Sequence, residues 1–232
     1  MKLALLGDIH GNALALEAVL NSAKDKNVSH YLITGDFVGY YYEPAIVLDM
    51  IAEIPATSVI GNHDQMFLAC RHNEAVLKSY RKKYGSGMDF ALDQLEDKHI
   101  DFIKKLPDTD RFSIASATIL LAHGAPWDTN CYIYPDAKRN LWDKLDAAEV
   151  EFIVLGHTHY QFSKTLENTM VINPGSVGQP RDKKHGASWT LFDTETKLFT
   201  HHNEEYDIGK VIQMAKKYDK GFAYLQEVLI RQ

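Results

Sequence analysis

Five short polar pieces of this sequence hold seven potential metal ligands, and each piece contains a glycine and lies at the end of an apolar run. The pieces are Gly7-Asp8-Ile9-His10-Gly11-Asn12, Gly35-Asp36, Gly61-Asn62-His63-Asp64, His123-Gly124 and Gly156-His157-Thr158-His159. An α/β sheet delivers side chains to one edge in this way, because its buried strands are continuous apolar runs that open into loops at their carboxyl ends. The pattern therefore predicts an α/β fold with a cluster of ligands at a sheet edge.

The first third of the chain predicts strands that alternate with helices. Four short apolar or β-branched runs are typical of strands covered on both faces. Three of them lie in this first third, at residues 3–6, 31–34 and 57–60, and the fourth lies at residues 152–155. Residues 14–24 repeat apolar positions with an approximate helical period, and residues 43–50 predict a second helix. The order βαβαβ implies parallel strands with right-handed crossovers.

The rest of the chain has a different pattern. Residues 65–106 carry charged helical stretches, such as residues 74–84 and 89–105, and predict a helical insertion over the site. Beyond residue 111, shorter strands with hairpin-like turns predict a second sheet packed on the first. The expected strands are residues 118–121, 169–172, 188–192 and 198–200. Residues 207–218 and 221–230 predict terminal helices. We expect one domain over residues 1–232, with two sheets flanked by helices.

Composition limits the classes of partner. Lys and Arg number 25 and Asp and Glu number 31, so the formal charge of −6 argues against binding to bulk nucleic acid or to an anionic membrane. A nucleotide-sized substrate stays open, because a metal centre makes its own local field. Cys70 and Cys131 form no CxxC pair, which disfavours a thiolate zinc site or a disulfide framework. The sequence contains no signal-like or membrane-length apolar run, so we expect a cytoplasmic protein.

The potential ligands offer oxygen and nitrogen without sulfur. Asp8 and His10 lie two residues apart after a strand, so both can point into one edge pocket. Asp36 ends the second strand and could bridge two cations about 3.5–4 Å apart, with one carboxylate oxygen on each. One amide oxygen and three imidazoles complete the set, from Asn62, His123, His157 and His159. Such ligation suits Mn, Fe, Zn, Ni or Co, of which we favour Mn.

The charge of such a centre predicts a reaction class. Two divalent cations, two carboxylates and a bridging hydroxide leave a net charge of about +1, which attracts an anionic phosphate. A cation can lower the pKa of bound water to about 7, so a hydroxide could attack phosphorus directly. His63 should face away from Asn62 and could donate a proton to the leaving alkoxide. Asp64 could then orient His63 through its other ring nitrogen.

The five pieces resemble the calcineurin-like metallophosphoesterase superfamily, whose pattern runs D-x-H, G-D, G-N-H-[DE], H and G-H-x-H in that order. The stretch from Asn173 to Arg181 is similar to a segment of its small bacterial and archaeal phosphodiesterase branch. The resemblance implies a four-layer αββα sandwich with two mixed sheets. It also implies His63 as the general acid that contacts phosphate. The implied ligands are Asp8, His10, Asp36 and His159 for one metal, and Asp36, Asn62, His123 and His157 for the other.

Departures from related patterns narrow the activity. Phosphoprotein phosphatases of this superfamily resemble G-D-x-V-D-R-G followed by G-N-H-E, whereas residues 35–41 lack that Arg and Asp64 replaces the Glu. These departures disfavour protein phosphatase activity. The resemblance to the small branch implies a metal-dependent phosphoester hydrolase that favours small phosphodiesters. A phosphomonoesterase and a nucleoside polyphosphate hydrolase remain alternatives. An inactive metal-binding scaffold is an alternative of another class, and the presence of His63 argues against it.

Three further features lie outside the expected set of site residues. Arg181 could offer a planar fork to phosphate or pair with Asp182. Asn12 is expected to cap the helix that starts near Ala13. The tyrosines at 40–42 and the aromatic residues at 127–134 could stack on a nucleobase, although packing against helices is the commoner role. The sequence does not determine the oligomeric state.

Overall fold

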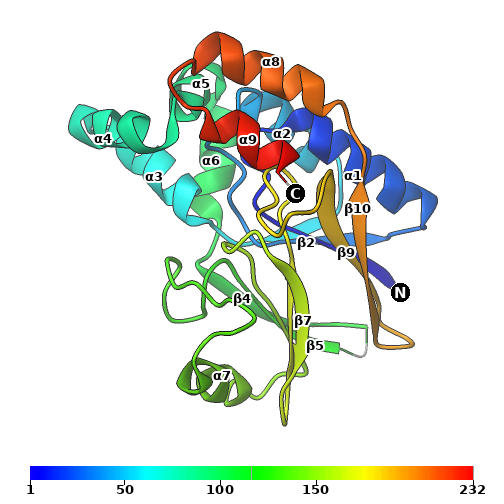
Figure 1. Ribbon diagram of the computed structural model, residues 1–232. Helices are drawn as coiled ribbons and strands as arrows, with labels where there is room; N and C mark the ends of the chain where they lie inside the picture. The colour runs from blue at the N-terminus through cyan, green and yellow to red at the C-terminus, as the bar shows by residue number, and fades with distance from the viewer. Residues whose placement is uncertain (116, 232) are drawn as a thin grey trace.

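The computed structural model describes residues 1–115 and 117–231 and forms two five-stranded sheets (Figure 1). The first sheet has the order β10-β9-β1-β2-β3. Its strands are β1 (Lys2–Leu6), β2 (His30–Ile33), β3 (Ala56–Ser58), β9 (Ala187–Asp193) and β10 (Leu198–Glu204). The second sheet has the order β4-β5-β6-β8-β7. Its strands are β4 (Thr109–Ile114), β5 (Ala117–Ala122), β6 (Phe152–Val154), β7 (Gln161–Thr165) and β8 (Met170–Pro174).

Both sheets are mixed. In the first, β1, β2 and β3 are parallel, and β9 runs antiparallel to β1 and to β10. In the second, β5, β6 and β8 are parallel, and the edge strands β4 and β7 are antiparallel to their neighbours. The parallel strands therefore bring their carboxyl ends to one edge of each sheet, which is where the polar pieces of the sequence begin.

Helices cover the outer faces of the two sheets (Figure 1). They are α1 (Ala13–Asp25), α2 (Pro44–Ala52), α3 (Asn62–Cys70), α4 (Glu74–Tyr84), α5 (Gly87–Gln94), α6 (Asp97–Lys105), α7 (Arg139–Asp146), α8 (Ile208–Tyr218) and α9 (Tyr224–Ile230). In the described part of the chain, α7 covers the second sheet, and α1, α2, α5 and α6 lie over the first. None of the helices within residues 1–115 and 117–231 has the length and apolarity needed to cross a membrane.

Alternation along β1 explains the layering. Leu3 and Leu5 pack between the sheets against residues of β5, β6 and β8, whereas Ala4 and Leu6 pack on the helical side. Successive side chains of a strand point to opposite faces, so a strand that is apolar at every position can bury both faces. Leu3, Ala4, Leu5 and Leu6 all have no exposed surface. The result is the predicted four-layer αββα sandwich.

Edge elements are where the sequence-based expectation was incomplete. Strands β4 and β7 lie at the two edges of the second sheet and were not predicted, because an edge strand with one exposed face has no continuous apolar run. Helix α7 was also missed. The charged stretch at residues 89–105 was expected as one helix and is instead α5 and α6, separated at Leu95 and Glu96, whose backbones are extended.

Candidate metal centre

The five polar pieces meet at the carboxyl ends of the parallel strands. Asp8 and His10 follow β1, Asp36 follows β2, and His123 follows β5. Asn62 and His63 begin α3, and His157 and His159 follow β6. We call the seven expected ligands the ligand cluster: Asp8, His10, Asp36, Asn62, His123, His157 and His159. Each member exposes 5% or less of its surface. The tertiary structure thus brings together every ligand residue that the sequence singled out.

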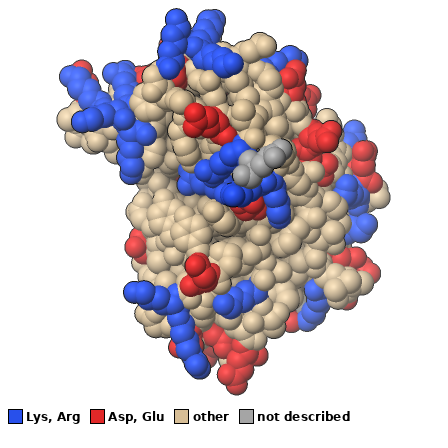
Figure 2. Space-filling view, viewed as in Figure 1, with Lys and Arg blue, Asp and Glu red and all other residues tan. Residues whose placement is uncertain are grey.

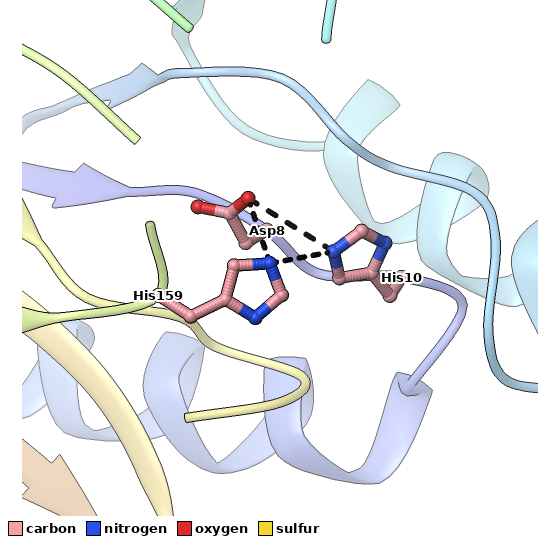
Figure 3. A group of neighbouring side chains, drawn as sticks. All are labelled: Asp8, His10 and His159. Carbon is pink, nitrogen blue, oxygen red and sulfur yellow. Dashed lines mark hydrogen bonds and ion pairs between the residues drawn. The ribbon is translucent and has the colours of Figure 1, made fainter. Parts of the chain in front are cut away.

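One side of the ligand cluster contains Asp8, His10 and His159 (Figure 3). The Nε2 atoms of His10 and His159 lie 3.1 Å apart. Asp8 Oδ1 lies 3.2 Å from His159 Nε2 and 3.9 Å from His10 Nε2. One carboxylate oxygen and two ring nitrogens therefore converge on a point that a single cation could occupy.

The other side contains Asp36, His123 and His157, with the amide of Asn62 beside them. His123 Nε2 lies 2.9 Å from Asn62 Oδ1, 3.1 Å from His157 Nδ1 and 3.3 Å from Asp36 Oδ2. Because two imidazole nitrogens, an amide oxygen and a carboxylate oxygen converge here, this side offers a second set of oxygen and nitrogen donors.

Asp36 joins the two sides through one oxygen. Its Oδ2 lies 3.6 Å from His10 Nε2 on the first side and 3.3 Å from His123 Nε2 on the second. Its Oδ1 accepts the backbone N–H of His63 at 2.8 Å. Oδ2 is therefore the oxygen that lies between the two sides, while Oδ1 binds the start of α3. Which oxygen each cation would take stays a prediction.

Three histidines are held by backbone carbonyls. The Nδ1 atoms of His10, His123 and His159 lie 3.1, 2.8 and 2.6 Å from the carbonyl oxygens of Val38, Thr34 and Gln179. A carbonyl can only accept, so each neutral ring carries its proton on Nδ1 and presents the lone pair of Nε2 to the cluster. This tautomer is the one that binds metal ions.

Several close contacts in the ligand cluster are unfavourable without a cation. Asp8 Oδ1 is buried and makes no hydrogen bond of acceptable geometry in the described part of the chain. The rings of His10 and His159 direct two nitrogen lone pairs at each other. Buried polar atoms are normally satisfied by partners, and a bound cation would satisfy all three atoms. The donor set present therefore fits divalent metal binding.

The ionisation states of Asp8, His10 and His157 favour metal binding. Burial opposes ionisation of Asp8, but the neighbouring His159 and His123 lower the pKa of Asp8 to about 2. Burial lowers the pKa of His10 well below its usual value, and likewise that of His157 to about 3. His123 differs: burial favours its neutral ring, yet the charge of Asp36 raises the pKa of His123 to about 9. A cation must displace this proton.

The backbone of the ligand cluster is strained. Five of its residues have positive φ angles between 53° and 65°: Asp8, His10, Asp36, His157 and His159. Residues other than glycine rarely adopt this conformation, and it persists where the surrounding structure imposes it. Gly61 shows how tightly the loops pack, because a Cβ atom there would lie 2.1 Å from Asp36 Oδ1. The strain is concentrated on residues whose side chains converge, as at functional sites in general.

Asp64 has a different role from the expected one. Its two carboxylate oxygens accept the backbone N–H groups of Gly61 and of residues 36–38, at 2.8 to 3.3 Å. These bonds tie the loop after β2 to the start of α3. Asp64 therefore does not orient His63, since its oxygens are turned towards the backbone, and the expectation that it would do so is wrong.

His63 is instead paired with a tyrosine. Its Nδ1 lies 2.8 Å from Tyr80 Oη, and both residues are buried. Burial lowers the pKa of His63 to about 4. His63 also lies near His10 and Asp36, close enough that the three could share a cation on geometry alone. No sequence signal pointed to Tyr80, because it lies on α4 with no motif around it.

A pocket of about 300 Å³ opens onto the ligand cluster. Six side chains form what we call the pocket wall: Lys83, Tyr84, Tyr132, Arg181, Phe222 and Tyr224. They come from α4, from the loops after β5 and β8, and from the C-terminal segment. Figure 2 shows Lys and Arg side chains gathered over α4, at the upper left of the molecule. Apart from Tyr132 and Arg181, the wall residues had no sequence signal.

The features left open by the sequence now have a place. Arg181 donates to Tyr40 Oη and Gln179 Oε1, both at 3.0 Å. Asp182 pairs with Lys184 instead. Asn12 caps α1 by accepting the N–H of Ala15, as predicted. The tyrosines at 41 and 42 are buried against α8 and α9, which confirms packing for these two, whereas Tyr132 is 47% exposed and stacks on His157.

The sequence matches a family model, that of the calcineurin-like phosphoesterase superfamily domain, over residues 1–197. The chain belongs to this superfamily. A structure of a metallophosphoesterase from Sphaerobacter thermophilus is 26% identical, with a TM-score of 0.77, and the match covers 99% of this chain and 98% of that one. This calcineurin-like phosphoesterase is thus a hydrolase of a metal-dependent family.

Two further relatives extend over nearly the whole phosphoesterase. An uncharacterised protein of Methanocaldococcus jannaschii is 29% identical over 236 residues, covering 93% of this chain and 92% of its own. A hypothetical protein of Pyrococcus horikoshii OT3 has a crystal structure with a TM-score of 0.85 and 22% identity, covering 99% of this chain and 98% of that one. The second comparison shows only that the two folds are alike. Both matches extend past the family match into the C-terminal helices.

Proposed function

We propose that this phosphoesterase hydrolyses small phosphodiesters with two divalent cations, Mn being the first candidate. One cation would be held by Asp8, His10, Asp36 and His159. The other would be held by Asp36, Asn62, His123 and His157. The observation that carries the proposal is the position of Asp36 Oδ2 within 3.6 Å of ring nitrogens on both sides of the cluster. A single anionic oxygen between two donor sets is what a bridged pair of cations needs.

The chain supplies the environment for the reaction. When bound, the cations would supply positive charge for the phosphate and a water molecule of lowered pKa as nucleophile. Arg181 lies in the pocket wall with its side chain bonded only to neutral oxygens in the described part of the chain. A guanidinium can form two parallel hydrogen bonds to a phosphate. We add Arg181 to the expected site as the side chain that binds the phosphoryl group.

His63 would protonate the leaving oxygen. Its Nδ1 is engaged by Tyr80, which leaves Nε2 for the pocket that His63 lines. Burial lowers the pKa of His63 to about 4, and an anionic phosphoryl group beside the ring would offset this effect by favouring the imidazolium. The bond between phosphorus and the leaving oxygen then breaks as that oxygen takes the proton from Nε2.

A nucleoside polyphosphate is the second candidate substrate. Lys83 and Arg181 are two cations in one pocket wall, beside the aromatic rings of Tyr84, Tyr132 and Tyr224. A second positively charged side chain beside Arg181 would suit a substrate with more than one phosphate. Exposed aromatic rings can stack on a base. A phosphomonoester would use only the ligand cluster and Arg181.

The test is a substrate panel on protein loaded with Mn, Fe, Zn, Ni or Co. Chromogenic phosphodiesters, phosphomonoesters and dinucleoside polyphosphates are compared by kcat/KM, and bound metal is counted by elemental analysis. We expect two metals per chain and the highest kcat/KM on diesters. His63→Ala should keep both metals and lower kcat by about 10²- to 10⁴-fold. One metal per chain, or undiminished turnover in His63→Ala, would contradict the proposal.

A further inference from the structure

The ring of His63 is set by residues outside the sequence motif that contains it. His63 packs against the rings of Tyr80, Tyr84 and Tyr40, with centroids 4.8 to 5.6 Å away. Only Tyr80 makes a polar contact with the ring among the hydrogen bonds of residues 1–115 and 117–231, at 2.8 Å to Nδ1. Tyr80 lies on α4 and exposes 3% of its surface. Its hydroxyl therefore decides which way the ring faces.

Gly39 makes this contact possible. A Cβ atom at position 39 would lie 2.6 Å from His63 Nδ1 and 2.8 Å from Tyr80 Oη. Both distances are too short for a side chain, so any other residue would displace one partner. Gly39 also has φ of +106°, a conformation that L side chains rarely adopt. The loop after β2 thus leaves space for a hydroxyl that arrives from α4.

In the part of the chain that the structure describes, no carboxylate competes for Nδ1 of His63. Asp64, the acidic residue next to His63, has both oxygens bonded to backbone N–H groups. Asp36 Oδ1 accepts the backbone N–H of His63, and Oδ2 faces the other ligands. The only partner available to orient the ring in the described part of the chain is a neutral hydroxyl.

We propose that Tyr80 is a positioning residue that holds His63 with Nε2 directed at the leaving oxygen of the ester. This inference rests on the proposed function, since it assigns Tyr80 a role only if His63 is the acid. It gives the helical segment between β3 and β4 a part in the reaction, because α4 supplies the group that orients the acid.

A hydroxyl fits this position chemically. In the imidazolium, Nδ1–H donates to Tyr80 Oη while Nε2–H faces the leaving oxygen. The bond between phosphorus and that oxygen breaks, the oxygen takes the Nε2 proton, and a neutral ring with Nδ1–H remains bonded to Tyr80. Burial raises the pKa of Tyr80 well above its usual value, so the hydroxyl stays neutral. A carboxylate here would add negative charge beside an incoming anion, which a hydroxyl avoids.

The experiment compares Tyr80→Phe with Tyr42→Phe in the metal-loaded protein. The two tyrosines are matched: each is buried, and each hydroxyl makes one side-chain hydrogen bond of 2.8 Å, that of Tyr42 to Asp219 away from the pocket. The substrates are aryl methyl phosphodiesters whose phenols range from strongly to weakly acidic. A weakly acidic phenol leaves slowly without a proton donor, so these esters depend most on a positioned His63.

We expect Tyr80→Phe to lower kcat by about tenfold or more on the weakly acidic phenols. The strongly acidic phenols should be affected least, so log kcat should fall more steeply with the pKa of the phenol. KM and metal content should not change, and Tyr42→Phe should retain the wild-type slope. A general loss of packing would lower all rates together, so a parallel shift of the whole series in Tyr80→Phe would overturn the inference.

His63→Ala and the double variant separate this inference from the proposed function. If His63→Ala keeps the wild-type slope, His63 is not the acid and both proposals fail. If His63→Ala steepens the slope and Tyr80→Phe does not, only the role of Tyr80 fails. If Tyr80→Phe costs nothing further in the His63→Ala background, the two residues act as one unit and the inference is supported.

A second measurement applies even if Tyr80→Phe does not fold. In zinc-loaded wild-type protein, the nitrogen resonances of the His63 ring report which nitrogen carries a hydrogen bond. A hydrogen-bonded Nδ1 with slow proton exchange supports the contact with Tyr80. A ring with freely exchanging Nδ1 would overturn it.

Discussion

The ligand cluster and the pocket wall line the same pocket, which has a volume of about 300 Å³, and they differ in burial and in how their side chains are held. Every member of the cluster is at least 95% buried, and its rings and carboxylates are held by backbone groups. The wall includes Tyr132 and Tyr224, which are 47% and 42% exposed. Its residues come from helix ends and loops that are far apart in sequence. The side chains of the cluster are thus fixed by their surroundings, whereas exposed side chains of the wall can be replaced with less effect on their neighbours.

The difference predicts how each region responds to substitution. When a buried group with buried partners is replaced, its partners are left without hydrogen bonds, so the substitution destabilises the site. An exposed side chain on the wall leaves water in its place. We therefore expect substitutions in the cluster to abolish the reaction, and those in the wall to alter substrate preference.

Asp36→Asn should have the largest effect. The substitution removes the negative charge that faces both sides of the cluster, so the affinity for both cations should fall and turnover should become undetectable. Metal content and ester hydrolysis check this directly. Asp93→Asn, at an exposed position of α5, is the control and should behave as wild type. A variant at Asp36 with two metals and normal turnover would remove the distinction between cluster and wall.

Among the wall residues, Arg181 is the one whose substitution should lower activity strongly, as substitutions in the cluster do. It bonds to Tyr40 and Gln179 and its Nε is buried without a partner in the described part of the chain. Arg181→Gln should lower kcat/KM by about 100-fold, with metal content unchanged. Arg181→Lys should recover only part of the loss, because Lys has no planar fork. Arg139→Gln on the exposed face of α7 is the control. Equal activity in all three variants would refute a role in phosphate binding.

The pH dependence of metal affinity tests the cluster alone. Burial favours a neutral His123, but Asp36 raises the pKa of His123 to about 9, so below this pH a cation must displace a proton. His10 and His157 have lowered pKa values and contribute no such proton above pH 6. The apparent affinity should therefore rise about tenfold per pH unit from pH 6 to 8 and level off above 9. Chelator competition measures it, and a flat profile would contradict this assignment.

Tyr224→Ala should have the smallest effect. The side chain is 42% exposed and lines the pocket that opens onto the cluster. On a small methyl ester the change in kcat/KM should stay within about threefold. Esters with a large aromatic leaving group should lose more, through KM. A uniform loss on all substrates would show that the wall supports the cluster as well as the substrate.

Local patterns were sufficient for the parts of the fold that are buried on both faces. The run at residues 3–6 predicts a strand because a short apolar run that ends at a glycine is typical of a strand buried on both faces, and β1 lies there. Polar strands at the sheet edges, such as β7, were missed because their sequences contain no continuous apolar run. They form by pairing with a neighbouring strand, which the local sequence does not reveal.

The same division holds in the candidate site. Spacing and glycines predicted which residues of the ligand cluster meet, because strand order alone carries their side chains to one edge. The role of Asp64 was mispredicted, since adjacency to His63 in sequence does not determine the direction of a carboxylate. Tyr80 and Tyr224 had no signal, because they reach the pocket through the packing of α4 and α9.

The sequence by itself determined the superfamily, the two sheets and the residues that converge between them, because these depend on short-range patterns of apolar runs and polar ends. Only the tertiary structure decided that one oxygen of Asp36 faces both sides, that a tyrosine from α4 holds His63, and that Arg181 faces Tyr40 rather than Asp182. Such contacts join residues distant in the chain, and their geometry is set by how whole elements pack together.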